Sequence, residues 1–162
     1  YMRYPPLGQR SFGPTRVFFA AGANYAGEAN DNILAFAMIE TAEGMANLDA
    51  IAATPGLDGI YVGPADLTLS LTQGRLAPGF DREEPEMIAA LQTIVAACKR
   101  NGIRAALHCG TPDYAARAIG WGFDMTTVGG DSRFLAAAAG AAVAGFRKLT
   151  DGIAGQIEKG GY

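Results

Sequence analysis

The sequence has few of the residues on which several large classes of protein depend. It contains two cysteines and one histidine, and only 18% of its residues are charged. Cys98 falls on the apolar stripe of a predicted helix, which favours a buried thiol over a disulfide or a redox pair. The thirteen Lys and Arg residues are scattered and the formal net charge is −3, so no basic patch indicates nucleic acid or an anionic membrane as a partner. A small molecule is the expected partner.

Long apolar runs are also missing. No stretch approaches the roughly 18 to 20 apolar residues that a membrane-spanning helix needs, and the N-terminus lacks the basic-then-apolar layout of a signal peptide. A soluble, cytoplasmic protein is therefore expected. The 49% hydrophobic content over 162 residues is enough for one globular core or part of one. The chain opens at Tyr1 directly into a loop-like run, 4–8, as expected for a chain that begins in mid-protein.

Four short apolar runs predict β-strands, and helical patterns separate them. The strands are expected at 33–39, 59–62, 104–108 and 123–128. Apolar runs without alternation are typical of strands that are buried on both faces of a parallel sheet. Helices are expected at 15–32, 41–53, 87–98, 112–120 and from about 131 to 146, with a helical or frayed tail at 152–162.

This alternation predicts an α/β protein with parallel strands and right-handed crossovers. An eight-stranded (β/α)8 barrel takes about 250 residues, so four strand-helix units correspond to roughly half of one. The alternative is an open four-stranded sheet. In both architectures the functional groups gather at the carboxyl ends of the strands, where the loops converge.

Two acidic residues occupy such positions. Glu40 follows the first predicted strand, and Asp66 lies just beyond the second. Neighbouring strands are about 5 Å apart, so both carboxylates can reach one cation. An oxygen-only, incompletely filled shell favours Mg²⁺ or Mn²⁺, with water and substrate completing it. From position alone, a role as a helix N-cap is the alternative for either residue.

Several segments together resemble the HpcH/HpaI aldolase family, in particular its 4-hydroxy-2-oxoheptanedioate and 2-dehydro-3-deoxyglucarate aldolases. The segments are YPPLGQRSFG at 4–13, AMIETAEG at 37–44, NLDAI at 47–51, GLDGIYVGPADL at 56–67, GFD at 122–124 and VGGD at 128–131. The resemblance spans residues 4 to about 147. It implies a TIM barrel of the phosphoenolpyruvate/pyruvate-binding type, of which residues 1–162 form the C-terminal portion, roughly the last four β/α units of a single domain.

The resemblance also implies a class II, metal-dependent pyruvate aldolase. In that family the residues matching Glu40 and Asp66 hold Mg²⁺, Mn²⁺ or Co²⁺, which chelates the carboxylate and keto oxygens of pyruvate. Cleavage of a carbon–carbon bond beside a ketone passes through an enolate, and a cation stabilises its negative oxygen. No Schiff-base lysine is needed, and none of Lys99, Lys148 and Lys159 follows a predicted strand.

The resemblance further implies a substrate site around Gly63, Ala65 and Asp66, where backbone amides bind the pyruvate carboxylate. Met38 stands where related enzymes often have a substrate-contacting glutamine. The family's general-base histidine and enolate-stabilising arginine are expected upstream of Tyr1, and the resemblance gives His108 no role. Arg10 either binds an anionic substrate or orders its own loop, and the alternative is a salt bridge at the rim of the barrel.

The leading hypothesis is reversible aldol cleavage of a 4-hydroxy-2-oxo acid to pyruvate and an aldehyde. The alternatives are an oxaloacetate decarboxylase or an acyl-CoA ester lyase with the same metal-enolate site, and a non-catalytic fragment, since this portion alone is expected to be inactive. A homo-oligomer is also expected from the resemblance, with the helix from Phe134 to Phe146 as a candidate contact.

Overall fold

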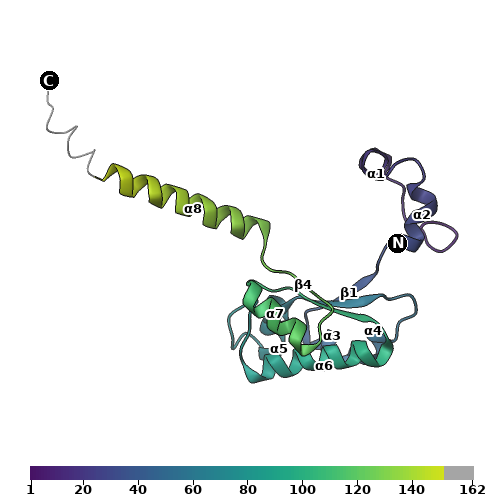
Figure 1. Ribbon diagram of the computed structural model, residues 1–162. Helices are drawn as coiled ribbons and strands as arrows, with labels where there is room; N and C mark the ends of the chain where they lie inside the picture. Colours follow the sequence, from purple (N-terminus) through teal and green to yellow (C-terminus); the bar gives the residue numbers. More distant parts are fainter. Residues whose placement is uncertain (152–162) are drawn as a thin grey trace.

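The computed structural model describes residues 1–151 and contains one parallel four-stranded sheet (Figure 1). The strands lie side by side in chain order: β1 (Phe36–Ile39), β2 (Gly59–Val62), β3 (Arg104–Leu107) and β4 (Met125–Thr126). All three neighbouring pairs are parallel. The expected α/β class with parallel strands is thereby confirmed. The tail expected at 152–162 lies outside the described residues.

Eight helices are described in residues 1–151. They are α1 (Pro14–Ala21), α2 (Tyr25–Asn32), α3 (Ala42–Ala46), α4 (Leu48–Ala52), α5 (Pro64–Thr72), α6 (Pro85–Asn101), α7 (Pro112–Trp121) and α8 (Asp131–Thr150).

The bounds of α6 and α7 follow from residues at their ends. Each begins with a proline, whose missing N–H is not needed in a first turn. The helix α6 ends at Gly102, which has a positive φ of 66°. The Thr111 side chain caps α7 by accepting a hydrogen bond from Tyr114 N–H.

Several expected bounds were wrong. The helix predicted at 41–53 is two short helices, because the chain leaves helical geometry at Asn47, and the segment predicted at 15–32 is likewise interrupted at Gly22. The last strand contains only Met125 and Thr126 rather than 123–128. No helix was expected at 64–72, where Pro64 starts helix α5 and Asp66 lies in its first turn rather than at its N-cap.

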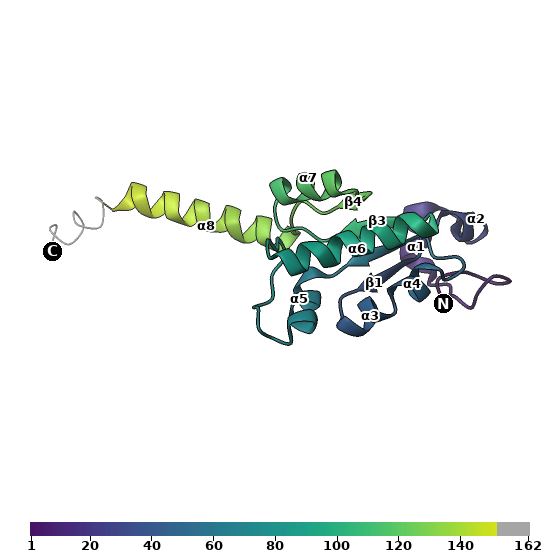
Figure 2. The same cartoon turned by 90° about the horizontal axis from the view of Figure 1, so that it is seen from below.

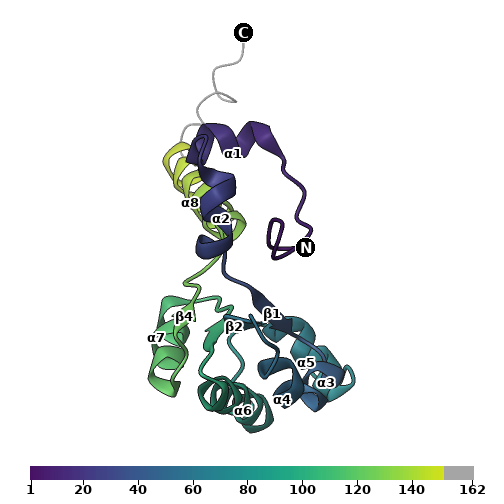
Figure 3. The same ribbon diagram turned by 90° about the vertical axis from the view of Figure 1, so that its right-hand side faces the viewer.

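The hydrophobic core lies between one face of the sheet and the helices α3 to α7 (Figures 2 and 3). Ile39, Val62 and Leu107 are in register across three strands, and each is at most 1% exposed. Alternate side chains point to the other face. There Met38, Tyr61, Ala106 and Met125 form one register row, and Met38 is 55% exposed. We call this side the open face, because Figure 3 shows no described helix packed against it.

Two parts of the chain extend away from the sheet. Figure 1 shows α1 and α2 on one side and α8 on another. Every residue of α8 from Asp131 to Leu149 is exposed, including the apolar Phe134, Leu135, Val143 and Phe146. None of the helices in residues 1–151 has the length and apolarity of a membrane span.

Candidate active site

The register of the sheet brings Glu40, Gly63 and His108 to the carboxyl ends of three neighbouring strands. Each directly follows one residue of the row Ile39, Val62 and Leu107. Since that row points into the core, the next residue of each strand points to the open face. Glu40 and His108 therefore lie on the same face as Met38 and Tyr61, with Gly63 between them.

Gly63 leaves the space that the Glu40 side chain occupies. A Cβ added to Gly63 would lie 2.7 Å from Glu40 Oε2, 3.1 Å from Glu40 Cβ and 3.6 Å from Met38 Sδ. The Glu40 carboxylate thus rests against the main chain of β2 where it passes into α5. This places Glu40 beside the segment that carries Asp66.

Asp66 is exposed and lies in the first turn of α5. The N–H of Leu67 donates to the carbonyl of Gly63 and is the first of the helical ladder. The preceding N–H groups of Ala65 and Asp66 therefore have no acceptor within the helix. A cavity of about 260 Å³ opens beside them and is lined by Met38, Tyr61, Gly63, Pro64, Ala65, Asp66, Phe80 and His108. We call it the Asp66 cavity.

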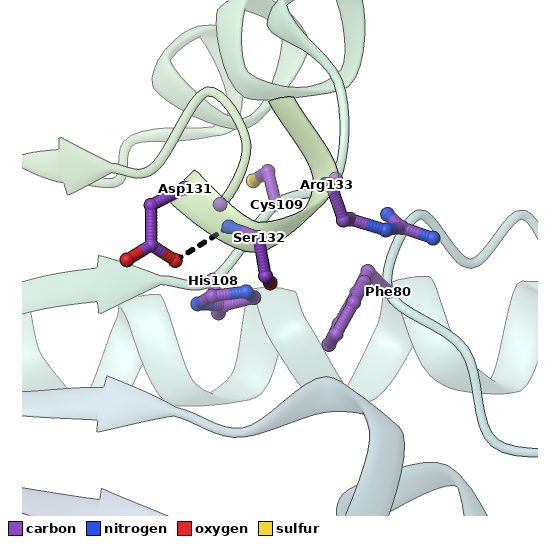
Figure 4. A pocket seen from close by; sticks show the side chains of 8 residues that line it. Phe80, His108, Cys109, Asp131, Ser132 and Arg133 are labelled. Carbon is purple, nitrogen blue, oxygen red and sulfur yellow. Dashed lines mark hydrogen bonds between the residues drawn. The ribbon is translucent and has the colours of Figure 1, made fainter. Parts of the chain in front are cut away.

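His108 stands between the Asp66 cavity and a second one. Its Nδ1 is 2.8 Å from the Tyr61 hydroxyl, and its ring centroid is 4.7 Å from that of Phe80. The second cavity, of about 410 Å³, is lined by Phe80, His108, Cys109, Gly110, Gly130, Asp131, Ser132 and Arg133 (Figure 4). We call it the Arg133 cavity. Phe80 and His108 line both cavities.

Burial keeps the Tyr61 hydroxyl and the Cys109 thiol beside these cavities protonated, and it does the same for the Cys98 thiol in α6. It raises the pKa of Tyr61, with a smaller contribution from nearby Cys109. Burial likewise raises the pKa of Cys109 to about 12 and that of Cys98 to about 11. Both thiols are free and buried, which confirms the expectation of a buried thiol at Cys98. Neither supplies a thiolate nucleophile near neutral pH.

The carboxylates of Glu40 and Asp66 fit a cation only if water or substrate fills the rest of its coordination shell. Within residues 1–151, no three His, Cys, Asp or Glu side chains gather as a metal cluster. Two carboxylates can still hold Mg²⁺ together with water and substrate oxygens, because this ion keeps several non-protein ligands. The space that Gly63 leaves for Glu40 Oε2 is consistent with such a site.

The predicted site residues Met38, Gly63, Ala65 and Asp66 line one cavity, with Glu40 beside Gly63. Sequence reasoning missed Tyr61, although its position between Ile60 and Val62 in a strand placed it on the face opposite the core. It also missed Phe80, which lies in a loop without any periodic signal. Arg10 donates a hydrogen bond to the Tyr25 hydroxyl at 3.0 Å and lies over the Tyr4 ring, so it orders its own loop.

The chain is an α/β protein with two cavities at the carboxyl ends of its parallel strands, the edge at which proteins of this class bind ligands. A family model described as HpcH/HpaI aldolase/citrate lyase matches residues 1–138. The chain belongs to this family.

Proteins similar to this chain carry aldolase names. It is 37% identical over 148 residues to a hydroxypyruvate/pyruvate aldolase of Rhizorhabdus wittichii, covering 91% of this chain and 58% of the relative. It is 35% identical over 131 residues to a 5-keto-4-deoxy-D-glucarate aldolase of Klebsiella pneumoniae, covering 80% and 49%. The chain thus spans about half the length of the curated relatives it matches.

Solved structures agree with the fold. A crystal structure of an HpcH/HpaI aldolase/citrate lyase family protein from Burkholderia cenocepacia matches with a TM-score of 0.71 and 30% identity, covering 90% of this chain and 57% of that one. Macrophomate synthase matches with a TM-score of 0.69, covering 94% and 54%, and its 24% identity supports the fold alone.

Proposed function

We propose that the complete protein is a class II pyruvate aldolase, which reversibly cleaves a 4-hydroxy-2-oxo acid to pyruvate and an aldehyde. The observation that carries the proposal is the Glu40 carboxylate lying against Gly63, at the start of the turn and helix that present Asp66 to a cavity. The aldolase names of the relatives support it. We further propose that β1 to β4 are four consecutive units of a (β/α)8 barrel whose remaining strands would cover the open face.

Glu40 and Asp66 would hold Mg²⁺ or Mn²⁺, with Co²⁺ as a further candidate. Such a cation acts as a Lewis acid on the keto oxygen, where negative charge develops during cleavage. The Ala65 and Asp66 N–H groups would orient the pyruvate carboxylate, since they have no acceptor within α5. Met38 and Tyr61 would form the wall of the same cavity and restrict water beside the reacting carbon.

In the cleavage direction the bond between C3 and C4 breaks, the C4 hydroxyl loses a proton, and C3 gains one to become the methyl group of pyruvate. The reaction is balanced without water or an external oxidant. The general-base histidine and the enolate-stabilising arginine are proposed to come from outside the 162-residue chain, which alone is proposed to be inactive. Homo-oligomers are proposed to form through the exposed apolar residues of α8.

Metal removal tests the proposal directly. Pyruvate release from a 4-hydroxy-2-oxo acid by the complete protein, followed with a coupled dehydrogenase, is expected to fall at least about tenfold with a chelator, because the Lewis acid is lost. Addition of Mg²⁺ or Mn²⁺ should restore it. Full activity in excess chelator would contradict the proposal.

The family description pairs aldolase with citrate lyase, so a second candidate is a lyase of acyl-CoA esters or an oxaloacetate decarboxylase using the same site. Turnover of oxaloacetate and of a malyl thioester, measured beside the aldol substrate, separates these activities. A kcat/KM for either one well above that for every aldol substrate would favour the second candidate.

Gly63→Ala is expected to weaken metal binding although Glu40 and Asp66 are both retained in the sequence. The added Cβ would meet Glu40 Oε2 at 2.7 Å, so the carboxylate must move, and displaced ligand geometry typically costs about 10 to 100-fold in metal affinity. Titration with Mn²⁺, followed by electron paramagnetic resonance, measures the change. Gly27→Ala is the matched control, because a Cβ there meets nothing within 4 Å. Equal affinities of the two variants would contradict the assigned position of Glu40.

A further inference from the structure

The loop of residues 73–84 connects α5 to α6 and reaches the carboxyl end of β3. We call it the α5–α6 loop. Of its residues, all of which the structure describes, only Phe80 lines a cavity, and it lines both. Its ring is half-buried and lies beside that of His108, with 4.7 Å between the two centroids (Figure 4). A loop residue can form such a shared wall only if the loop is held in place, because loops are more mobile than the elements they connect.

The side chain of Asp81, the next residue, attaches this loop to the segment between β3 and α7. Asp81 Oδ1 accepts a hydrogen bond from Gly110 N–H, and Oδ2 accepts one from the Thr111 hydroxyl, both at 2.7 Å. The same hydroxyl caps α7 by accepting a hydrogen bond from Tyr114 N–H. The Asp81 carboxylate therefore lies at the N-terminus of a ten-residue helix, where the helix dipole favours a negative charge.

The backbone on both sides of this contact permits the close approach. Arg82 N–H donates to the carbonyl of Phe80 at 2.8 Å, so the chain turns tightly at Asp81. The Tyr114 hydroxyl donates to the carbonyl of Arg82 at 2.5 Å and fixes the following peptide. A Cβ added to Gly110 would lie 3.3 Å from Asp81 Oδ2 and 3.5 Å from Phe80 Cβ. The absence of a side chain at Gly110 thus leaves space for the loop at the end of β3.

A further contact between the loop and α7 is more exposed. Glu83 and Arg117 form an ion pair at 2.5 and 2.9 Å, and their side chains are 59% and 49% exposed. Exposed ion pairs of this kind contribute little to stability. Asp81 instead bonds to a backbone N–H and to a helix cap, both of which have fixed positions. It is therefore the residue that determines where Phe80 lies.

We propose that Asp81 is a positioning residue of the active site, which clamps the α5–α6 loop to Gly110 and Thr111 and so holds Phe80 as the wall between the Asp66 cavity and the Arg133 cavity. This inference rests on the proposed aldolase function. Asp81 lines neither cavity, so it acts through the loop. A displaced Phe80 would join the two cavities and admit water beside the reacting carbon.

Two substitutions of Asp81 separate its hydrogen bonds from its charge. Asp81→Ala in the complete protein is expected to lower kcat for pyruvate release about tenfold, because small displacements in an active site are costly. Its affinity for Mn²⁺ should stay within about twofold, since the loop carries neither proposed metal ligand. Asp81→Asn removes the same charge but keeps an acceptor for Gly110 N–H, so its loss of kcat should be smaller. Equal losses in the two variants would overturn the proposal.

A double-mutant cycle with Phe80→Ala tests whether Asp81 acts through Phe80. In the Phe80→Ala background, Asp81→Ala is expected to change kcat by no more than about twofold, because the wall is already lost. A further tenfold loss in that background would show a general structural role and would contradict the proposal. Glu83→Gln is the matched control, since it removes one charge from the same loop at an exposed ion pair. Its kcat should stay within about twofold of the unmodified protein.

Amide hydrogen exchange measures the clamp independently of activity. The Gly110 amide loses its acceptor in Asp81→Ala, so it is expected to exchange at least about tenfold faster there than in the unmodified protein or in Glu83→Gln. Unchanged exchange would overturn the clamp. If the unmodified protein neither releases pyruvate nor exchanges the pyruvate methyl protons with solvent, the proposed function fails, and the role of Asp81 in it fails too. If it does both, but the losses from Asp81→Ala and Phe80→Ala multiply, only this inference is wrong.

Discussion

Glu40→Gln and Asp66→Asn are each expected to lower kcat/KM for pyruvate release by on the order of 10³-fold, the loss typical of removing one electrostatic stabiliser of a developing oxyanion. Both substitutions keep the shape of the side chain and remove its charge. Glu40 lies against the main chain at Gly63 and Asp66 lies in the next turn, so one cation would lose half of its protein ligands in either variant. Steady-state kinetics and Mn²⁺ titration of the complete protein measure the two effects together.

Glu43→Gln provides the matched control for this experiment. Glu43 is an exposed carboxylate three residues beyond Glu40, in the first turn of α3, and it lines neither cavity. Its activity should stay within about twofold of the unmodified protein, because an isolated surface charge contributes little. A loss in Glu43→Gln as large as that in Glu40→Gln would mean that general electrostatics, and not ligation, explains the result.

The sequence predicted the fold class because its strands are short apolar runs buried in a parallel sheet. β2 was predicted with the same bounds that the structure has, and the helix expected at 87–98 lies within α6. The positions of Glu40 and Asp66 at strand ends also followed from these runs. Periodicity sufficed there because burial on a fixed face leaves a direct signal in the sequence.

Other features depend on contacts that no local pattern carries. Helix α5 contains Thr68 and Thr72, which were not recognised as helical, yet each hydroxyl donates to the carbonyl four residues earlier and both residues are buried. Phe80 reaches His108 from a loop, and only the three-dimensional path of residues 73–83 brings it there. The apolar residues of α8 were compatible with burial or with an interface, and in the described chain they are exposed.

Leu107→Ala is expected to lower the free energy of unfolding by about 2 to 5 kcal/mol, the cost of truncating a fully buried leucine. Leu107 is 0% exposed and lies in register between Val62 and Thr126. Truncation removes three side-chain carbons and leaves a cavity that the neighbouring strands can fill only in part. Urea unfolding of the complete protein, followed by far-ultraviolet circular dichroism, measures the change in midpoint.

Leu69→Ala is the control, since Leu69 is the same residue type in a helix but is 37% exposed, and its truncation should cost less than Leu107→Ala by at least about 1 kcal/mol. Equal costs would mean that Leu107 is not part of the core.

The burial of Leu107 also matters for the site, because Leu107 and His108 point to opposite faces of β3. Burial of Leu107 fixes which face His108 occupies, as a shift of one residue in the register would turn His108 into the core. The core therefore determines the position of His108, which lies between the Asp66 cavity and the Arg133 cavity.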